Sequence, residues 1–249
     1  MSYSLILLDF DGTLAATEPV GWGNISRVLG EHFGVDQQQM HDFVCTRHGQ
    51  TIEQYYPDLC RQLGREIDPN GAEQVKRAHT ETLLPLLRQG IPPAGQLVSA
   101  LRSLSEQTPC RFCVTSNSVL PRLEASMDGM EAHTQGAGQG LRDLLSGIYS
   151  AQRFKPDPEV FLTAIQAQTD KPDHVVVVED SGAGMKAGAA LRDHCDMPVH
   201  LIGTTALRDD PYAGINGLME AGADVVIAED DWTLIAREIM TRVATADIS

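Results

Sequence analysis

The sequence has few aromatic residues and no long apolar run. Aromatic side chains make up 5% of the 249 residues, and no 18-residue apolar stretch occurs. Such a stretch is needed for a transmembrane helix, so we expect no membrane span. The amino terminus also lacks the basic segment and apolar stretch of a signal peptide. These absences predict a cytoplasmic protein that does not act at a membrane.

Basic residues are also scarce. Lysine and arginine number 19 against 34 aspartates and glutamates, which gives a formal charge of −15. A field of this sign repels polyanions, so nucleic acids and anionic membrane surfaces are excluded as expected partners. A small anionic substrate is still compatible with it, because one metal ion and a few aimed donors reverse the potential locally.

The five cysteines form no complete metal or redox set. Cys110 and Cys113 are spaced as C-x-x-C, but no second pair or neighbouring cysteine and histidine accompanies them. They also open an apolar run, where residues three apart point to opposite faces of a strand. We interpret them as two structural strand cysteines with reduced thiols.

Short apolar runs that end abruptly in polar or small residues predict the fold class. They are Ser4–Asp9, Arg111–Thr115, His174–Glu179, Val199–Gly203 and Ala223–Ala228, with Gly147–Ala151 as a weaker sixth. Runs of this kind, separated by segments that suit helices, are typical of a parallel sheet covered on both faces. The prediction is a Rossmann-like three-layer α/β core. Ligands of such sheets bind beyond the carboxyl ends of the strands.

A long helical interruption follows the first run, roughly from Ala15 to Arg88. Its helical stretches are Trp22–Phe33, Met40–Val44, Ile52–Leu63 and Ala72–Leu87. Two linkers, Ala15–Pro19 and Gln89–Gly95, would join it to the core and form a hinge. We therefore predict a core of residues 1–15 and 90–249 and an all-helical cap of residues 16–89. The stretch Gly129–Gly140 is interpreted as an exposed loop.

The strongest local signal is the segment Leu8–Leu14, which reads Leu-Asp-Phe-Asp-Gly-Thr-Leu. Two carboxylates two residues apart, directly after a buried strand, are costly without a cation to neutralise them. The glycine allows a sharp turn or a close approach of backbone. Alone, Asp-x-Asp also fits acidic residues that cap the helix after a strand.

Four segments in order resemble the signatures of the haloacid dehalogenase-like hydrolases, in the subgroup with a helical cap after the first strand. Asp9–Leu14 matches the first signature, and Thr115–Asn117 matches the second. Lys155, in Phe-Lys-Pro-Asp-Pro, matches the third, and Glu179–Gly184 matches the fourth. The resemblance covers essentially the whole chain.

The resemblance implies a phosphoryl-transfer site. Asp9 would attack phosphorus and form an aspartyl-phosphate, while Asp11 would protonate the leaving oxygen and later activate water. Ser116 would donate its hydroxyl to the phosphate, and Lys155 would supply a compact positive charge. We expect Gly12, Thr13 and Asn117, beside these groups, to bind substrate.

The resemblance also implies Mg²⁺ as cofactor, since this ion prefers hard oxygen ligands. The expected ligands are the Asp9 carboxylate, the backbone carbonyl of Asp11 and the Asp180 carboxylate. Glu179 is either a further ligand or a base that orients metal-bound water.

The hinge segment separates phosphatases from mutases. Many relatives read Asp-(Ser/Thr)-Glu-Pro-x-His here, whereas this chain has Ala16 at the acidic position and Gly21 at the histidine position. That histidine assists phosphoryl transfer in β-phosphoglucomutase-like members. We therefore expect hydrolysis of a small sugar, polyol or acid phosphate, with a β-phosphoglucomutase-like mutase as the alternative.

Substrate specificity is expected from the cap. Arg47 and His48 lie in a segment similar to a His-Gly-centred loop of glycerol- and sugar-phosphate phosphatases, so both are predicted to bind substrate. His48 at a solvent-facing helix start is an equally good interpretation. Lys76 is another candidate for contacting the substrate, but Lys76 and Arg77 also fit the solvated face of an amphipathic helix.

Other classes of protein fit less well. A receiver-like signalling module is about half this length and lacks Asp-x-Asp-Gly-Thr. A non-catalytic binding protein predicts loss of Asp9, Asp11, Lys155 or Asp180, and a true haloacid dehalogenase has little use for Asp11 and the metal acids. We expect a small phosphorylated metabolite as partner, and a monomer or weak dimer, because the site is complete within one chain.

Overall fold

The computed structural model describes residues 2–47, 50–133, 140–208, 211–212 and 214–246. Within these ranges, no helix has the length and apolar character needed to cross a membrane. His48, one of the residues predicted to bind substrate, lies outside the described residues.

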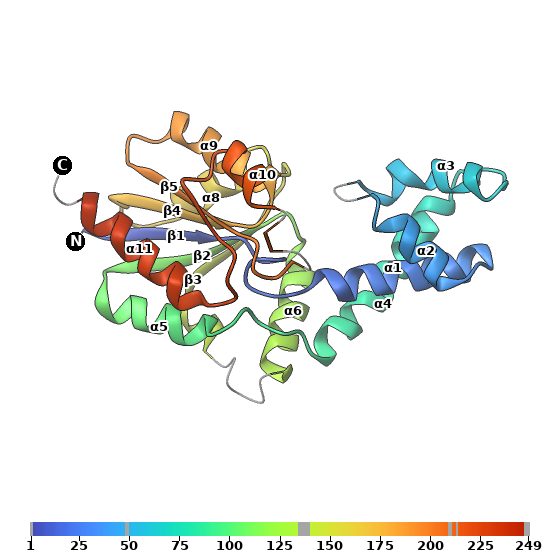
Figure 1. Ribbon diagram of the computed structural model, residues 1–249, viewed down its shortest axis with the longest axis horizontal. Helices are drawn as coiled ribbons and strands as arrows, with labels where there is room; N and C mark the ends of the chain where they lie inside the picture. Colours follow the sequence, from blue (N-terminus) through green and yellow to red (C-terminus); the bar gives the residue numbers. More distant parts are fainter. Residues whose placement is uncertain (1, 48–49, 134–139, 209–210, 213, 247–249) are drawn as a thin grey trace.

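One sheet of six parallel strands forms the centre of the molecule, in the order β3–β2–β1–β4–β5–β6 (Figure 1). The strands are β1 (Ser4–Leu8), β2 (Cys110–Ser116), β3 (Leu145–Ser150), β4 (His174–Glu179), β5 (Val199–Thr204) and β6 (Val225–Ile227). Every residue of β1 and β4 is buried, as expected of central strands covered on both faces.

Alternate side chains of the strands build two hydrophobic clusters on opposite faces of the sheet. Ile6 and Leu8 belong to one cluster, and Leu5 and Leu7 to the other. The first face packs against α5 (Leu97–Gln107), α6 (Leu120–His133), the short α7 (Leu141–Leu144) and α11 (Trp232–Ala246). The second packs against α8 (Glu159–Gln166), α9 (Gly182–Leu191) and α10 (Ile215–Glu220), with a 3₁₀ turn at Arg192–His194. The predicted three-layer fold is confirmed.

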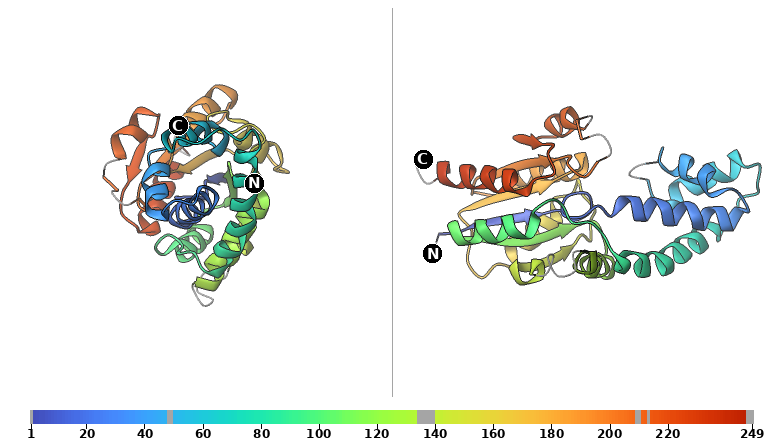
Figure 2. Two further views of the ribbon diagram at one scale, coloured as in Figure 1. Left: turned by 90° about the vertical axis from the view of Figure 1, so that its right-hand side faces the viewer. Right: turned by 60° about the horizontal axis from the view of Figure 1, so that its bottom comes forward.

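Four helices between β1 and α5 form a separate body at the end of the molecule next to the carboxyl ends of the strands (Figures 1 and 2). They are α1 (Glu18–Phe33), α2 (Gln37–Val44), α3 (Ile52–Gln62) and α4 (Gly71–Gln89). Their facing sides share a hydrophobic cluster of their own, which includes Leu29, Met40, Leu59 and Val75. These four helices are called the cap helices below.

Local sequence signals set the ends of the cap helices. α1 begins at Glu18, with Pro19 in its first turn, and ends at Gly34 in the left-handed conformation (φ +65°). The Asp36 side chain caps α2 by accepting from the Gln38 N–H at 2.8 Å. The predicted end of the linker Ala15–Pro19 was therefore wrong, because its last two residues belong to α1. A proline lacks only an N–H that the first turn leaves unpaired, so Pro19 starts the helix instead of preceding it.

The two connections to the cap helices lie side by side. The Ala16 N–H donates to the Pro92 carbonyl at 3.1 Å, and the Ala94 N–H donates to the Leu14 carbonyl at 2.9 Å. This pairing brings the segments before α1 and after α4 together, as a hinge requires. The predicted boundaries at residues 16 and 89 stay a prediction.

The interpretation of Gly129–Gly140 as a loop was wrong at its start. Gly129 lies inside α6, which continues to His133, and residues 134–139 are outside the described ranges. A Cβ on Gly129 would lie 1.9 Å from the Leu87 carbonyl oxygen. The glycine is thus a contact point that lets α4 approach α6, and its small size was misread as a loop signal.

Replacing Gly129 with alanine should weaken this contact. We expect Gly129→Ala to lower the free energy of unfolding by about 1–3 kcal/mol, because Cβ must displace a main-chain carbonyl. Gly23→Ala is the matched control, since Gly23 is also helical but a Cβ there meets no atom within 4 Å. That variant should gain roughly 0.5–1 kcal/mol from reduced chain entropy. Urea unfolding measures both; equal effects of the two substitutions would contradict the contact.

Candidate active site

The carboxyl ends of the three central strands bring the predicted catalytic residues together. In the register of the sheet, Leu8 of β1 faces Val114 of β2 and Val178 of β4. Asp9 follows β1, and its N–H donates to the Val178 carbonyl at 3.0 Å. Ser116 and Glu179 end the two flanking strands, and both are buried.

Lys155 joins this edge from the segment between β3 and α8. Its Nζ donates to Asp9 Oδ1 at 2.7 Å, to Glu179 Oε1 at 2.5 Å and to the Thr115 carbonyl at 2.7 Å. The side chain of Lys155 is 2% exposed. Burial disfavours the charged ammonium, but the two carboxylates outweigh it and raise the pKa of Lys155. The ammonium therefore stays charged and spans the two acids.

Asn117 holds the backbone of Lys155 in place. Its Oδ1 accepts a hydrogen bond from the Lys155 backbone N–H at 2.9 Å. Beside it, the Ser116 Oγ accepts from the Ser118 N–H at 3.0 Å, which leaves its own proton available for a ligand. The predicted second and third signatures thus meet directly through Asn117 and Lys155.

Three buried carboxylates form a cluster that suits a metal ion. Oxygens of Asp9, Glu179 and Asp180 lie within 4.8 Å of one another. Burial, followed by the charge of Glu179, raises the pKa of Asp9 well above its usual range. The same two causes, in the same order, raise the pKa of Asp180 to about 8. The three carboxylates carry more negative charge than the Lys155 ammonium and the Arg208 guanidinium together offset, and a divalent cation would offset the excess. An all-oxygen donor set fits Mg²⁺.

The two acids after β4 differ in how their oxygens are used. Glu179 Oε1 accepts from Lys155, and its Oε2 accepts from the Ser181 N–H at 3.1 Å and the Ser181 hydroxyl at 2.9 Å. A Cβ on Gly184 would lie 1.9 Å from the Glu179 carboxyl carbon, so the first turn of α9 closes over this side chain. Glu179 is therefore held on both oxygens by protein donors.

The predicted residues Gly12 and Thr13 approach Asp180. Thr13 Oγ1 lies 3.4 Å from Asp180 Oδ1. Gly12 has a φ of +82°, and a Cβ there would lie 2.6 Å from Asp180 Oδ2. Only glycine fits this turn, for both its conformation and its space. The turn after Asp11 therefore places its backbone directly against the Asp180 carboxylate.

Asp11 is held by three side chains that the sequence did not single out. Its Oδ1 accepts from the Thr17 hydroxyl at 2.5 Å and from Arg122 Nη2 at 3.2 Å. Its Oδ2 accepts from the Ser118 hydroxyl at 2.5 Å. These residues lie in the linker to α1, after β2 and in the first turn of α6. Two signals were available: Thr17 stands at the Ser/Thr position of the hinge pattern, and Ser118 lies two residues after Ser116.

Arg208 is a further basic residue that sequence reasoning missed. Its guanidinium donates to the backbone carbonyl of Asp180 and lies 3.8 Å from the Asp180 carboxylate. It comes from the segment after β5, where no family signature draws attention to it. Arg208 therefore holds Asp180 from the segment that follows β5.

Two of the cap residues named as candidate ligands, Arg47 and Lys76, have partners within the cap helices. Arg47 lies 3.9 Å from Asp58 and stacks over the Phe43 ring at 4.9 Å. Lys76 pairs with Glu53 at 2.7 Å, which supports its interpretation as part of a solvated helix face. Neither ion pair reaches the acids at the end of the sheet.

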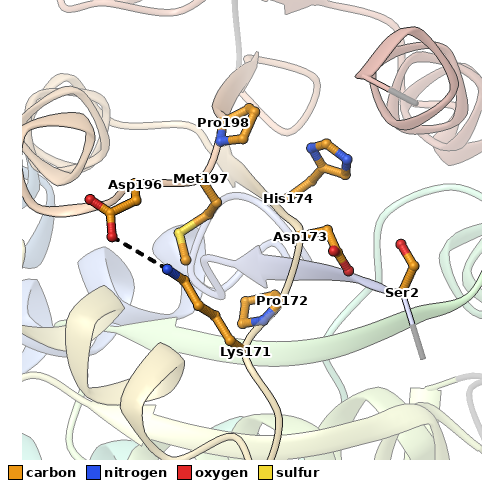
Figure 3. Close-up of a pocket in the computed structure, with 8 residues that line it drawn as sticks. All are labelled: Ser2, Lys171, Pro172, Asp173, His174, Asp196, Met197 and Pro198. Carbon is orange, nitrogen blue, oxygen red and sulfur yellow. Dashed lines mark hydrogen bonds and ion pairs between the residues drawn. The ribbon is translucent and has the colours of Figure 1, made fainter. Parts of the chain in front are cut away.

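A separate hollow lies at the opposite end of the strands. This cavity, of about 530 Å³, is lined by residues that include Ser2, Lys171, Asp173 and His174 (Figure 3). His174 is the first residue of β4, whereas Glu179 is the last. The hollow is thus distinct from the acidic cluster, and Figure 3 shows no convergence of its side chains on one point.

Similarity to known proteins agrees with this geometry. Protein CbbY of Cereibacter sphaeroides is 24% identical over 225 residues, covering 88% of this chain and 93% of that protein. The 6-phosphogluconate phosphatase of Escherichia coli K12 is 27% identical over 183 residues, covering 74% and 76%. A predicted phosphoglycolate phosphatase from Haemophilus somnus, a crystal structure, superposes with a TM-score of 0.73 at 18% identity, covering 96% and 99%.

A match to the sequence profile of a protein family identifies the family. The sequence profile of the haloacid dehalogenase-like hydrolases matches residues 3–192, which spans β1 to α9 and includes Asp9, Lys155 and Asp180. With the four predicted signatures gathered at one edge of the sheet, the chain belongs to the haloacid dehalogenase-like hydrolase family.

Proposed function

We propose that this hydrolase is a magnesium-dependent phosphatase of small phosphomonoesters that forms an aspartyl-phosphate on Asp9. The observation that carries the proposal is the place of the Asp9 carboxylate. It contacts the Lys155 ammonium and lies within 4.8 Å of oxygens of Glu179 and Asp180, with Asp11 two residues away. Lys155 occupies Oδ1 of Asp9, and no donor among the described residues meets Oδ2. That oxygen is free to attack.

In the first half-reaction, Asp9 Oδ2 forms a bond to phosphorus as the bond from phosphorus to the leaving oxygen breaks. Asp11 gives its proton to that oxygen, and the alcohol departs. The Ser116 hydroxyl donates to a phosphoryl oxygen, and the positive charge of Lys155, whose three N–H groups are taken by Asp9, Glu179 and the Thr115 carbonyl, stabilises the phosphoryl group electrostatically between nucleophile and leaving group.

In the second half-reaction, water attacks the phosphorus of the aspartyl-phosphate. Asp11, now ionised, takes a proton from this water, the bond to Asp9 breaks, and inorganic phosphate leaves. The hydroxyls of Thr17 and Ser118 hold Asp11 for both proton transfers.

The Asp9 and Asp180 carboxylates and the backbone carbonyl of Asp11 are the proposed ligands of Mg²⁺. When bound, the ion neutralises charge on the phosphoryl oxygens and on the acids. Glu179 is proposed to act by orienting Lys155 and its neighbours, because protein donors already occupy both of its oxygens. Gly12 and Thr13 bring backbone close to the phosphate, and Asn117 holds Lys155 in place.

The proposed substrates are phosphorylated sugars, polyols or small acids. The name of the Escherichia coli relative specifies a phosphorylated sugar acid, and that of a Thermotoga maritima relative, 25% identical over 243 residues, specifies phosphorylated carbohydrates. The cap of residues 16–89 would cover the leaving group. The proposed substrate contacts of Arg47 and His48 belong to this part.

The mutase alternative is less well supported. Gly21 lies in the first turn of α1 and brings no side chain to the hinge, and a Cβ there would meet no atom within 4 Å. The site therefore lacks an imidazole at the position where mutase-like relatives place one. Hydrolysis needs no such group.

Phosphate release tests the proposed function. We expect Mg²⁺-dependent release from p-nitrophenyl phosphate and from at least one sugar, polyol or acid phosphate. Asp9→Asn should lower kcat by roughly 10⁴-fold or more, because the covalent route is lost. EDTA should abolish activity, and MgCl₂ should restore it. Conversion of β-glucose 1-phosphate to the 6-phosphate, without release from any ester, would instead identify a mutase.

The raised pKa of Asp180 predicts a pH-dependent effect of Mg²⁺ on stability. Without metal, the native state keeps a proton on Asp180 up to about pH 8, whereas the unfolded state loses it near pH 4. Stability of the metal-free protein should therefore fall as pH rises through this window. Mg²⁺ binds the ionised form, so its stabilising effect should grow with pH.

Thermal unfolding with MgCl₂ or EDTA, at about pH 6 and about pH 8.5, measures this effect. We expect the rise in Tm on adding Mg²⁺ to be larger at the higher pH. Asp180→Asn should remove most of the rise at both values. An equal rise in Tm at both pH values in the wild type would contradict the assignment of Asp180 as a ligand.

A further inference from the structure

Arg122 lies next to the proposed general acid but has no part in the mechanism above. It belongs to the first turn of α6, and its Nη2 lies 3.2 Å from Asp11 Oδ1. The side chain is 29% exposed, so part of it is open to a ligand. A cation at this place faces the leaving-group side of the site, since Asp11 delivers its proton to the leaving oxygen.

The contact with Asp11 does not by itself account for an arginine at position 122. The Thr17 hydroxyl already donates to Oδ1, and the Ser118 hydroxyl donates to Oδ2. Arg122 adds one contact from one of its nitrogens. A single-contact ion pair that is partly exposed contributes little to stability.

The guanidinium also has donors left over. Its Nε is buried and has no hydrogen-bond partner. Among the residues that the structure describes, Asp11 is the single acceptor it meets. A guanidinium carries five N–H donors in a planar fork. Buried donors are rarely left unpaired, which indicates that a ligand completes the set.

Other basic residues near the site are already engaged. Lys155 is enclosed by two carboxylates and the Thr115 carbonyl, on the phosphoryl side. Arg208 contacts the carbonyl and carboxylate of Asp180. In the cap helices, Arg47 and Lys76 are paired with Asp58 and Glu53. The Arg47 Nε is also buried without a hydrogen-bond partner, but that side chain lies against Asp58 and Phe43 in the cap helices. Of the three cations that contact the acids of the site, Lys155, Arg208 and Arg122, the last is the one with a buried donor left unpaired.

Arg122 also faces the cap helices. His79, on α4, has its pKa lowered to about 4, first by burial and then by the positive charge of Arg122. The guanidinium thus contacts the general acid directly, and its charge also acts on a residue of α4, one of the cap helices.

We propose that Arg122 is a specificity residue that binds a second anionic group, a carboxylate or a phosphate, on the leaving group of the substrate. The planar fork of arginine matches either anion with two parallel hydrogen bonds. The enzyme then prefers esters that are acidic at both ends over neutral polyol phosphates. This inference rests on the proposed phosphatase function and narrows its substrate class.

Two matched pairs of esters test the assignment. 6-Phosphogluconate and glucitol 6-phosphate differ only in a carboxylate against a hydroxymethyl group. Glucose 1,6-bisphosphate and glucose 6-phosphate form the corresponding phosphate pair. The readout is the ratio of kcat/KM within each pair, for the wild type, Arg122→Gln, Arg122→Lys and Ser118→Ala.

In at least one pair, the wild type should prefer the doubly acidic ester, and that pair identifies the anion. Arg122→Gln should lower this ratio roughly 10–100-fold, the loss expected for charge-assisted hydrogen bonds. Arg122→Lys should keep part of it. Ser118→Ala is the control, because it removes a hydrogen bond to Asp11 and no charge. It should slow both members of a pair alike and leave the ratio unchanged.

An unchanged ratio in Arg122→Gln for both pairs would overturn the inference while the phosphatase function stands. A fall of the ratio in Ser118→Ala by the same factor would overturn it too, since Arg122 would then act only through Asp11. If no ester is hydrolysed, the proposed function fails separately. Calorimetric binding of the same esters to Asp9→Asn, with and without Arg122→Gln, then measures the preference without turnover.

Discussion

The Lys155 ammonium, held between the carboxylates of Asp9 and Glu179, is the interaction on which the site depends. Its Nζ meets both acids and a main-chain carbonyl within 2.7 Å, and the side chain is almost fully buried. Burying such a group costs several kcal/mol unless its partners are in place. The partners come from three adjacent strands, β2, β1 and β4, and the lysine comes from the connection between β3 and α8, so this part of the sheet must form before the charges are satisfied.

Close packing of the backbone then fixes the positions of the acids in this cluster. Gly12 brings the turn after Asp11 against Asp180, and Gly184 lets the first turn of α9 close over Glu179. Neither position has room for a Cβ. The acids are consequently held in a buried position near one another, so that burial and, after it, the charge of Glu179 raise the pKa values of Asp9 and Asp180. Repulsion stored in this way favours binding of a cation, because the cation relieves it.

Much of this arrangement could be predicted from the sequence, but not all of it. Buried runs and the residues that end them carry their signal locally, so the sheet and the meeting of Asp9 with Glu179 followed from them, whereas Lys155 was assigned to the site by the family resemblance. The partners of Asp11 could not be predicted this way. Thr17, Ser118 and Arg122 reach it from three separate segments, and an ordinary serine or arginine looks the same in a sequence whether or not it faces a catalytic acid. Gly129 was misread for a related reason, since its function lies in a contact with Leu87 rather than in its neighbours.

The distribution of charge also explains how a chain with a formal charge of −15 can bind an anion. The net negative charge of the chain repels such a ligand. Salt screens this repulsion over a Debye length of about 8 Å at physiological ionic strength, so only charged groups near the ligand contribute strongly. Lys155 contacts Asp9 at 2.7 Å, and Arg122 contacts Asp11 at 3.2 Å. Under the proposed function, these two cations would serve the two ends of the substrate, the transferred phosphoryl group near Lys155 and the leaving group near Arg122. Binding of an anion would then depend on these few groups and on the proposed metal ligands, and not on the net charge of the chain.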